Sequence, residues 1–223
     1  METLRERKKE QTRRLIADRA RQLFAERGFE QVTVAEVARA ADVSQATIFN
    51  YFPTKEDLFY SGLEAFEEAL LAAIREREPG ESVLAAFGRF VLEPRGLLAA
   101  TDPDAIEHLA AITRTITESP ALLAREQRIF DRYTESLATL LAEETGAAPD
   151  EVEPRVAANA LLGVHRALVD YSRRQIMAGV RNPQLARRVR AQGRKALALV
   201  ERGLADYAVK GNRRRGQAAG GLS

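Results

Sequence analysis

The sequence contains no cysteine and no tryptophan among its 223 residues, and aromatic residues make up only 6% of it. Without cysteine, a disulfide framework, a thiolate nucleophile and a cysteine-based metal site are all excluded. The longest apolar run covers the six residues 69–74, whereas a membrane-spanning helix needs about 20. The charged N-terminus has no apolar segment behind it and so differs from a signal peptide. We therefore expect a soluble, cytoplasmic protein without a membrane partner.

Charge is unevenly distributed, although the net charge is only +2. Residues 1–21 carry eight basic and four acidic groups, and the last 14 residues carry four basic groups and no acidic one. Basic ends on a nearly neutral body suggest a polyanionic partner, but solvated termini would show the same pattern. The tail, residues 210–223, is low in apolar residues and is expected to be disordered.

Helical periodicity runs through the rest of the chain and predicts an all-α fold of about nine helices. A first helix is expected at 10–27, and two short helices follow within 33–52. A long helix should start at the capping pair Thr54 and Asp57 and run to Pro79. The remaining helices are expected near residues 81–99, 103–118, 120–145, 152–179 and 183–208.

The two short helices within 33–52 are separated by residues 41–44 and follow a helix that can brace both. This layout is typical of a helix-turn-helix, whose second helix enters the major groove of DNA, although any three-helix cluster would share the periodicity. Glutamine can pair with adenine, and alanine or the threonine methyl can contact the thymine methyl. The outward positions of the second helix carry such types, namely Gln45, Ala46, Thr47 and Asn50.

Over residues 12–59 the chain resembles the DNA-binding domain of the TetR family of bacterial regulators. The matching residues, at the spacing of the family, include Ala20, Leu23, Phe24, Gly28, Phe29, Thr33, Val34, Ala38, Ala41, Val43, Ser44, Thr47, Tyr51, Phe52, Lys55 and Leu58. The resemblance implies a three-helix DNA-binding domain with a basic arm (1–53) and a helical domain for ligand binding and dimerisation (54–209). The phosphate contacts that it implies are Thr33, Ser44, Tyr51 and Lys55. The base-reading positions that it implies are Gln45, Ala46 and Thr47, and Asn50 can serve in either role.

Two residues depart from the family pattern. Asp42 stands where a glycine is usual at the turn, and we expect the aspartate to adopt a left-handed backbone conformation at some cost. Phe49 replaces the usual tyrosine. Because it has no hydroxyl group for a phosphate contact, we assign it to packing.

The C-terminal two-thirds shows no catalytic constellation, no cofactor motif and no metal site, and its only histidines are His108 and His165. The resemblance places a ligand cavity among residues 81–145 and the inner face of 152–179. Residues 97–126 also resemble regulators of the mycofactocin type or those that take acyl-CoA-like ligands. Polar residues in apolar surroundings can orient a largely apolar ligand, or can be packing or surface residues. Four such residues are His108, Tyr133, Asn159 and Arg166.

The last two helices carry apolar stripes at helical spacing. In the TetR resemblance these helices form a four-helix dimer interface, although the stripes could also pack within the monomer. The first stripe is Val156, Ala160, Val164, Ala167 and Tyr171, and the second is Leu197, Val200 and Leu204.

Together these features predict a homodimeric repressor that binds a palindromic double-stranded DNA operator and is released by a small, largely apolar effector. A regulator without an effector is the first alternative. A small helical enzyme is the second, and it is disfavoured because no acid–base or nucleophile constellation is present.

Overall fold

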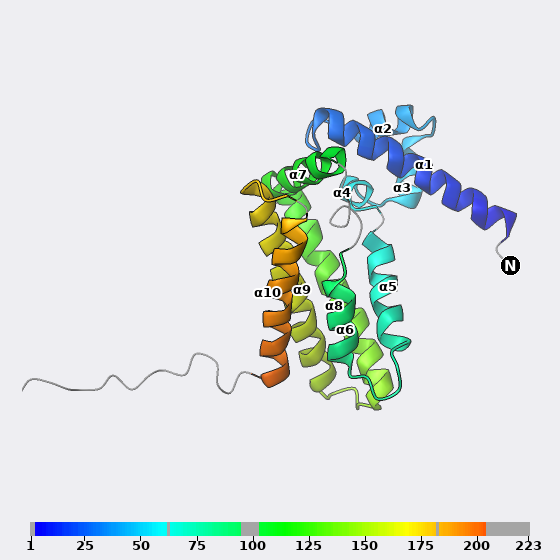
Figure 1. Ribbon diagram of the computed structural model, residues 1–223. Coiled ribbons are helices and arrows are strands. Elements are labelled where there is room, and N and C mark those ends of the chain that lie inside the picture. The colour runs from blue at the N-terminus through cyan, green and yellow to red at the C-terminus, as the bar shows by residue number, and fades with distance from the viewer. Residues whose placement is uncertain (1–2, 62, 95–102, 182, 204–223) are drawn as a thin grey trace, which may run out of the picture.

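The computed structural model describes residues 3–61, 63–94, 103–181 and 183–203. These residues form ten helices and no strand, which confirms the all-α prediction. Figure 1 shows a head of short helices and α1 above a bundle of longer ones, with α7 between them. The helices are α1 (Leu4–Arg27), α2 (Val34–Ala40), α3 (Gln45–Tyr51), α4 (Lys55–Phe59), α5 (Leu63–Arg75), α6 (Val83–Leu92), α7 (Pro103–Glu118), α8 (Pro120–Thr145), α9 (Glu153–Met177) and α10 (Gln184–Arg202).

The head consists of α1 to α4, and its chain reversals follow from caps that the sequence encodes. Thr33, Ser44 and Thr54 precede α2, α3 and α4, and each side chain accepts a hydrogen bond from a backbone N–H three residues later. These bonds satisfy donors that a helix leaves open at its start. Gly28 ends α1 with φ at 81°, a value that other residues rarely adopt. The chain therefore folds back repeatedly over one face of α1.

A buried apolar core holds the head together. Ile16, Ala20 and Phe24 supply it from α1, and Val37 and Ile48 supply it from α2 and α3. Because α3 is anchored by one face only, its other face is left for a partner.

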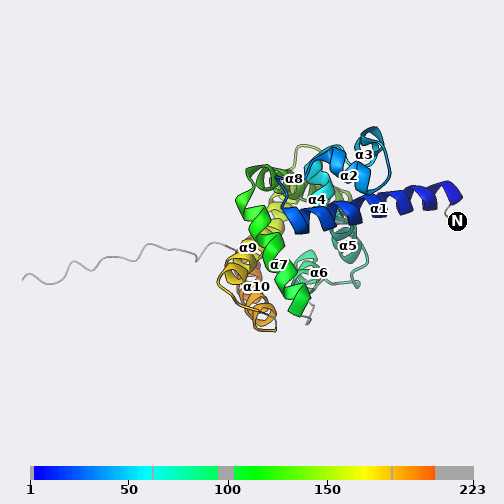
Figure 2. The same cartoon turned by 90° about the horizontal axis from the view of Figure 1, so that it is seen from above.

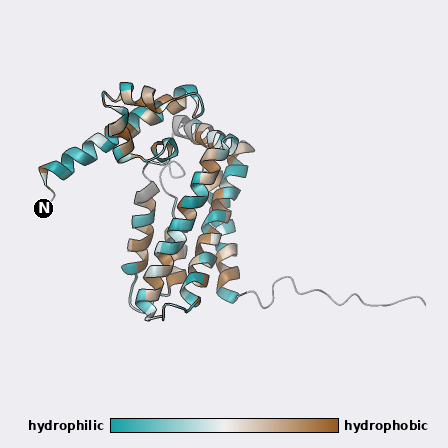
Figure 3. Cartoon of the chain, turned by 180° about the vertical axis from the view of Figure 1, so that it is seen from behind, coloured by the Kyte–Doolittle hydropathy of each residue, from teal (hydrophilic) through white to brown (hydrophobic). Residues whose placement is uncertain are grey.

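The body consists of α5, α6, α8, α9 and α10, and α7 crosses between the body and the head (Figures 1 and 2). Figure 3 shows the apolar parts of the long helices turned mainly toward one another. Gly193 lets α10 approach its neighbours closely. A Cβ atom at this position would collide with Leu92 of α6 and would lie 3.3 Å from Cδ1 of Leu168 of α9.

The single long helix expected between Thr54 and Pro79 is wrong, because the structure has two helices there. α4 ends at Phe59 and packs in the head, where Leu58 is fully buried. α5 packs in the body and buries Leu70 and Ile74. Serine and glycine are weaker helix formers than alanine, and the sequence between the two helices contains both at positions 61 and 62. This break raises the number of helices from the expected nine to ten.

The other boundaries agree with expectation to different degrees. The helices expected at 103–118 and 120–145 have those limits as α7 and α8. α6 ends at Leu92 rather than at residue 99, and residues 95–99 lie outside the described part of the chain, as do Leu204 and the tail 210–223. None of the described helices is long and apolar enough to span a membrane.

Candidate nucleic-acid interface

The exposed face of α3 carries the predicted base-reading residues. Gln45, Ala46 and Asn50 are exposed and Thr47 is half-buried, while Ile48 on the opposite face is fully buried. The Oγ atom of Ser44 accepts a hydrogen bond of 3.0 Å from the backbone N–H of Thr47. This cap fixes the first turn of α3, so the side chains stand on a rigid support.

The predicted phosphate-contacting residues differ in their exposure and in the contacts that hold their side chains. Thr33 is exposed, and its side chain forms a reciprocal capping box with Glu36 at the start of α2. Tyr51 is half-buried, and its carbonyl oxygen accepts a bond of 3.3 Å from Nη1 of Arg13. The Nζ atom of Lys55 lies 4.2 Å from the centroid of the Phe29 ring.

Lys55 is consequently held against the head rather than extended into solvent. Burial lowers the pKa of its ammonium below the usual range, and the carboxylates of Glu30 and Glu56 partly offset that effect. Its charge remains available at the edge of the head, next to the start of α4, for an anionic partner.

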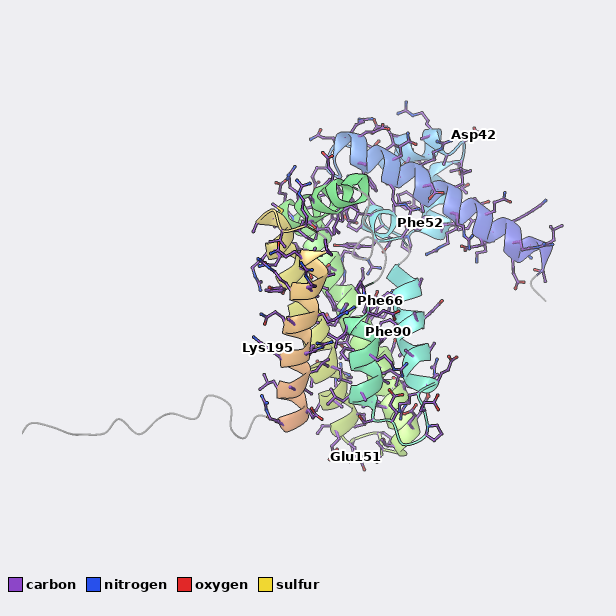
Figure 4. All side chains as sticks on the ribbon, viewed as in Figure 1. Asp42, Phe52, Phe66, Phe90, Glu151 and Lys195 are labelled. Atoms are coloured by element: carbon purple, nitrogen blue, oxygen red, sulfur yellow. The ribbon has the colours of Figure 1, made fainter. Side chains whose placement is uncertain are left out.

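The two departures from the family pattern have different outcomes. Asp42 adopts φ of 53°, which confirms the expected left-handed turn between α2 and α3, and Figure 4 places it at the outer edge of the head. The assignment of Phe49 to packing is wrong, because 48% of its surface is exposed. The cause is its place on α3, since Ile48 is the one buried residue of that short helix and Phe49 lies next to it, turned away from the core. An exposed aromatic ring here can contact a thymine methyl or the sugar.

The basic N-terminal segment is helical, which corrects the expectation that the first helix starts at residue 10. α1 begins at Leu4, and Thr3 and Glu6 form a capping box in which each side chain bonds the other's backbone. Residues 3–9 are all exposed, and Figure 2 shows this end of α1 projecting beyond the rest of the head. Periodicity could not find it because no apolar face is present, but the pattern Thr-x-x-Glu is itself a helix-start signal.

Deletion of residues 2–9 is expected to weaken operator binding and to leave the melting temperature almost unchanged. The segment carries four basic side chains on an exposed helix, and the removal of each phosphate contact should lower the slope of log K against log salt by about 0.9. Binding measured at several salt concentrations tests this. A second variant, with the four basic residues changed to glutamine, keeps the helix and should also bind more weakly. It separates the effect of the charges from the effect of the helix itself. Unaltered affinity in both variants would contradict the prediction.

Three polar contacts connect the head to the start of α8 and to Ser119, the residue that caps it. The Asp57 carboxylate of α4 accepts a bond of 2.6 Å from Nε of Arg125. The hydroxyl of Tyr60 donates to the carbonyl oxygen of Leu122 over 3.2 Å. Ser119 Oγ donates to the Glu30 carboxylate over 2.6 Å. Since α4 and α5 are separate helices, these contacts and the packing around them set the angle of the head on the body.

Comparison with known proteins identifies the families that this chain resembles. Residues 16–61 match the family model described as "Bacterial regulatory proteins, tetR family", and residues 95–180 match the model described as "MftR C-terminal domain". The HTH-type transcriptional regulator TcmR of Streptomyces glaucescens is 31% identical over 156 residues, which cover 68% of this chain and 69% of TcmR. The chain belongs to the TetR family.

Further relatives agree with this assignment. MftR of Mycobacterium tuberculosis, named for the transcriptional regulation of mycofactocin biosynthesis, is 26% identical over 67% of this chain and 73% of its own length. Among solved structures, NalD of Pseudomonas aeruginosa superposes with a TM-score of 0.53 at 20% identity, covering 84% of this chain and 97% of NalD. The latter likeness concerns the fold alone. The two relatives TcmR and MftR are both named as transcriptional regulators.

The TetR-type body does not bring the four predicted ligand-orienting residues together. Tyr133 of α8 is buried, and its ring stacks on Phe66 with centroids 5.6 Å apart. Arg166 is partly exposed and lies over the Phe130 ring at 4.8 Å. Asn159 is exposed, and its amide donates to the Arg155 carbonyl on its own helix, so it does not reach the interior. The side chain of His108, on α7, lies outside what the structure describes.

His165 is half-buried in the body and is not among the predicted ligand-binding residues. Its ring stacks on Phe66 with a centroid distance of 4.7 Å and an interplanar angle of 17°, and lies 5.6 Å from the Phe130 ring. Burial lowers the pKa of His165 to about 4. The sequence did carry a signal for this position, because Leu161 and Leu168 lie four residues before it and three after it on the buried face of α9.

Phe66, Phe90, Phe130, Tyr133 and His165 form one aromatic cluster in the body, drawn from α5, α6, α8 and α9. Figure 4 shows Phe66 and Phe90 close together between α5 and α6. Within the described residues, no three histidine, aspartate or glutamate side chains gather as they would around a metal ion.

The predicted dimer stripe on α9 is largely on the surface. Val156 is 62% exposed, and Ala160 and Ala167 are exposed too, whereas Tyr171 is half-buried. Val164 differs, because it is 6% exposed and belongs to the core of the monomer. On α10, Leu197 and Val200 are half-buried against the core of the body. The outer face of α9 is therefore the part of the two stripes that the monomer leaves uncovered.

Proposed function

We propose that this TetR-family regulator is a dimeric repressor that binds a palindromic operator through α3 and leaves it when a small, largely apolar effector binds in the body. The exposed face of α3 is the observation that carries the proposal. It presents an amide, a methyl group and a second amide at Gln45, Ala46 and Asn50 on a helix held rigidly by its buried face. Amides and methyl groups are the groups that discriminate base edges in the major groove.

Substitution of Lys55 and Gln45 separates affinity from sequence reading. Lys55→Gln removes the ammonium that lies over the Phe29 ring, and with it the charge, so it should weaken binding to all sequences and lower the salt slope by about 0.9. Gln45→Ala should lower discrimination at one base position per half-site, by roughly 1–3 kcal/mol. Binding to a set of operator variants at several salt concentrations tests both. A change of sequence preference in Lys55→Gln with an intact salt slope would contradict the assigned roles.

The aromatic cluster of the body supports an effector that is largely apolar and carries one or two polar groups. His165 stays neutral at physiological pH because its pKa is near 4, so its ring can accept one hydrogen bond and donate another. It has no hydrogen-bond partner within the described residues. The match of residues 95–180 to the MftR C-terminal domain covers α8 and α9, two of the four helices that supply the cluster. Acyl-CoA-like molecules and planar aromatic metabolites are the classes to be screened.

An effector present at 100 times its dissociation constant should stabilise the protein by about 2.7 kcal/mol, which a thermal-shift screen detects. His165→Phe combined with Tyr133→Phe should abolish effector-dependent release while keeping operator affinity. Gln127→Ala is the matched control, because this residue is exposed on α8 and belongs neither to the aromatic cluster nor to the outer face of α9, and it should respond as the parent does. A full response in the double variant would place the pocket elsewhere. Operator occupancy that depends only on protein concentration would support a regulator without an effector.

A further inference from the structure

A polar cavity of about 200 Å³ lies where the head meets the body. Arg13 of α1, Arg125 and Arg132 of α8, and Asp57 of α4 line it, together with Ser61, which follows α4. On the same measure one water molecule needs roughly 15 Å³, so the space is large enough for a small polyatomic ligand. The lining carries three guanidinium groups and one carboxylate, so positive charge predominates.

Arg125 and Arg132 keep N–H donors that their ion pairs do not use. Each guanidinium has five N–H groups. Within the described residues, Arg125 uses two nitrogen atoms for Asp57, at 2.6 and 2.5 Å, and Arg132 uses Nε for Glu67 at 2.9 Å. The remaining donors of both residues can reach an anion without breaking these pairs. Planar guanidinium groups bind phosphate and carboxylate oxygens in paired geometry.

The Ser61 hydroxyl is an independent indication of a ligand. Its Oγ atom is buried and is the one buried side-chain polar atom without a hydrogen-bond partner in the described part of the chain. A buried hydroxyl without a hydrogen-bond partner has lost its hydration without compensation, which has a cost in stability. Because Ser61 lines the same cavity as the arginines, an oxyanion there would accept its hydrogen bond and relieve that cost.

We propose that this cavity is a binding site for a small oxyanion, a phosphate or the phosphate group of a metabolite, separate from the apolar effector site of the body. The bound anion joins Arg13 of the head, Ser61 at the junction and two arginines of the body. It therefore stabilises one angle between head and body, and by reciprocity it changes the affinity for the operator. The effect on the operator rests on the proposed function, whereas the binding of the anion does not.

Isothermal titration with inorganic phosphate, pyrophosphate and citrate, at constant ionic strength, tests the site on the full-length protein. Saturable binding of phosphate is expected, with pyrophosphate tighter than citrate. A hydrogen bond to a charged group contributes enough for about a tenfold change in the dissociation constant. Ser61→Ala should weaken phosphate binding by about tenfold without lowering the melting temperature of the free protein. Arg132→Gln should weaken it similarly.

Arg155→Gln is the matched control, since Arg155 forms an exposed ion pair with Glu135 on a different part of the body. It should bind phosphate as the parent does. Equal weakening in Arg155→Gln and Ser61→Ala, or no saturable binding in the parent, would overturn the site. Tighter binding of citrate than of pyrophosphate would overturn the phosphate assignment. Anion binding that persists when operator binding is absent would leave the site intact and refute only the proposed DNA-binding function.

Discussion

The variant Ala160→Glu is expected to be a folded monomer that has lost specific operator binding. Ala160 lies exposed in the middle of the outer face of α9, so the substitution does not disturb the core. A twofold interface would bring each new carboxylate close to its own copy and so double the charge that must be buried. Because one helix-turn-helix reads only half of an operator, affinity should fall toward the non-specific level, about 10³-fold or more.

Sedimentation equilibrium and far-ultraviolet circular dichroism, measured together with operator affinity, decide the outcome. Ala124→Glu is a matched control, because Ala124 is also an exposed alanine in a long helix but lies on α8. It should remain a dimer. Val164→Glu is unsuitable, since Val164 is buried and the variant would unfold for a different reason. A dimeric Ala160→Glu protein with parental affinity would exclude this face of α9 as the interface.

Acidification should destabilise the protein through His165. In the unfolded chain the histidine binds a proton near pH 6.5, but in the folded protein burial lowers its pKa to about 4. Between these values the unfolded state holds more protons, so the free energy of unfolding falls as the pH is lowered. The separation of the two pKa values corresponds to a loss of about 3 kcal/mol, complete only below pH 4.

Urea unfolding measured between pH 7 and pH 4.5 tests this prediction. The lower limit avoids Glu36, whose pKa is lowered to about 2 by hydrogen bonds from Thr33 and Arg27, so that its contribution is lost only below pH 4.5. His165→Phe keeps a ring against Phe66 and should flatten the profile in this range. A substitution of His108, the only other histidine, gives the comparison. If His165→Phe retained the full pH dependence, another group would be responsible.

The elements whose limits are set by local chemistry can be predicted from the sequence. Ser119-Pro120 and Gly146 delimit α8 by capping, and α3 is recognisable because its cap, its buried Ile48 and its polar face are all local features. The roles of individual residues in DNA contact remain predictions.

Other features depend on contacts distant in sequence and could not be predicted from periodicity. α5 keeps the apolar rhythm that α4 begins, so the sequence predicts one helix, and only the packing of α4 in the head and of α5 in the body separates the two. Its aromatic side chain predicts that Phe49 packs in the core, but α3 turns it toward solvent. Periodicity indicates the buried face of α9 near His165, but the stacking of its ring against Phe66 and Phe130 depends on how α5 and α8 pack there.

The break between α4 and α5 determines how much energy switching requires. In one continuous helix, turning the head would bend several hydrogen-bonded turns. Here the break allows rotation about the backbone bonds near Tyr60 and Ser61, as at other hinges, and it is opposed by the apolar packing between head and body and by the polar contacts to α8. Three such contacts amount to a few kcal/mol, and a ligand that binds one head angle about 10³-fold more tightly supplies about 4 kcal/mol. Under the proposed function, single substitutions at Glu30, Asp57 or Tyr60 are therefore expected to shift the effector concentration at which the regulator leaves the operator. None of these residues lies on α3 or in the aromatic cluster.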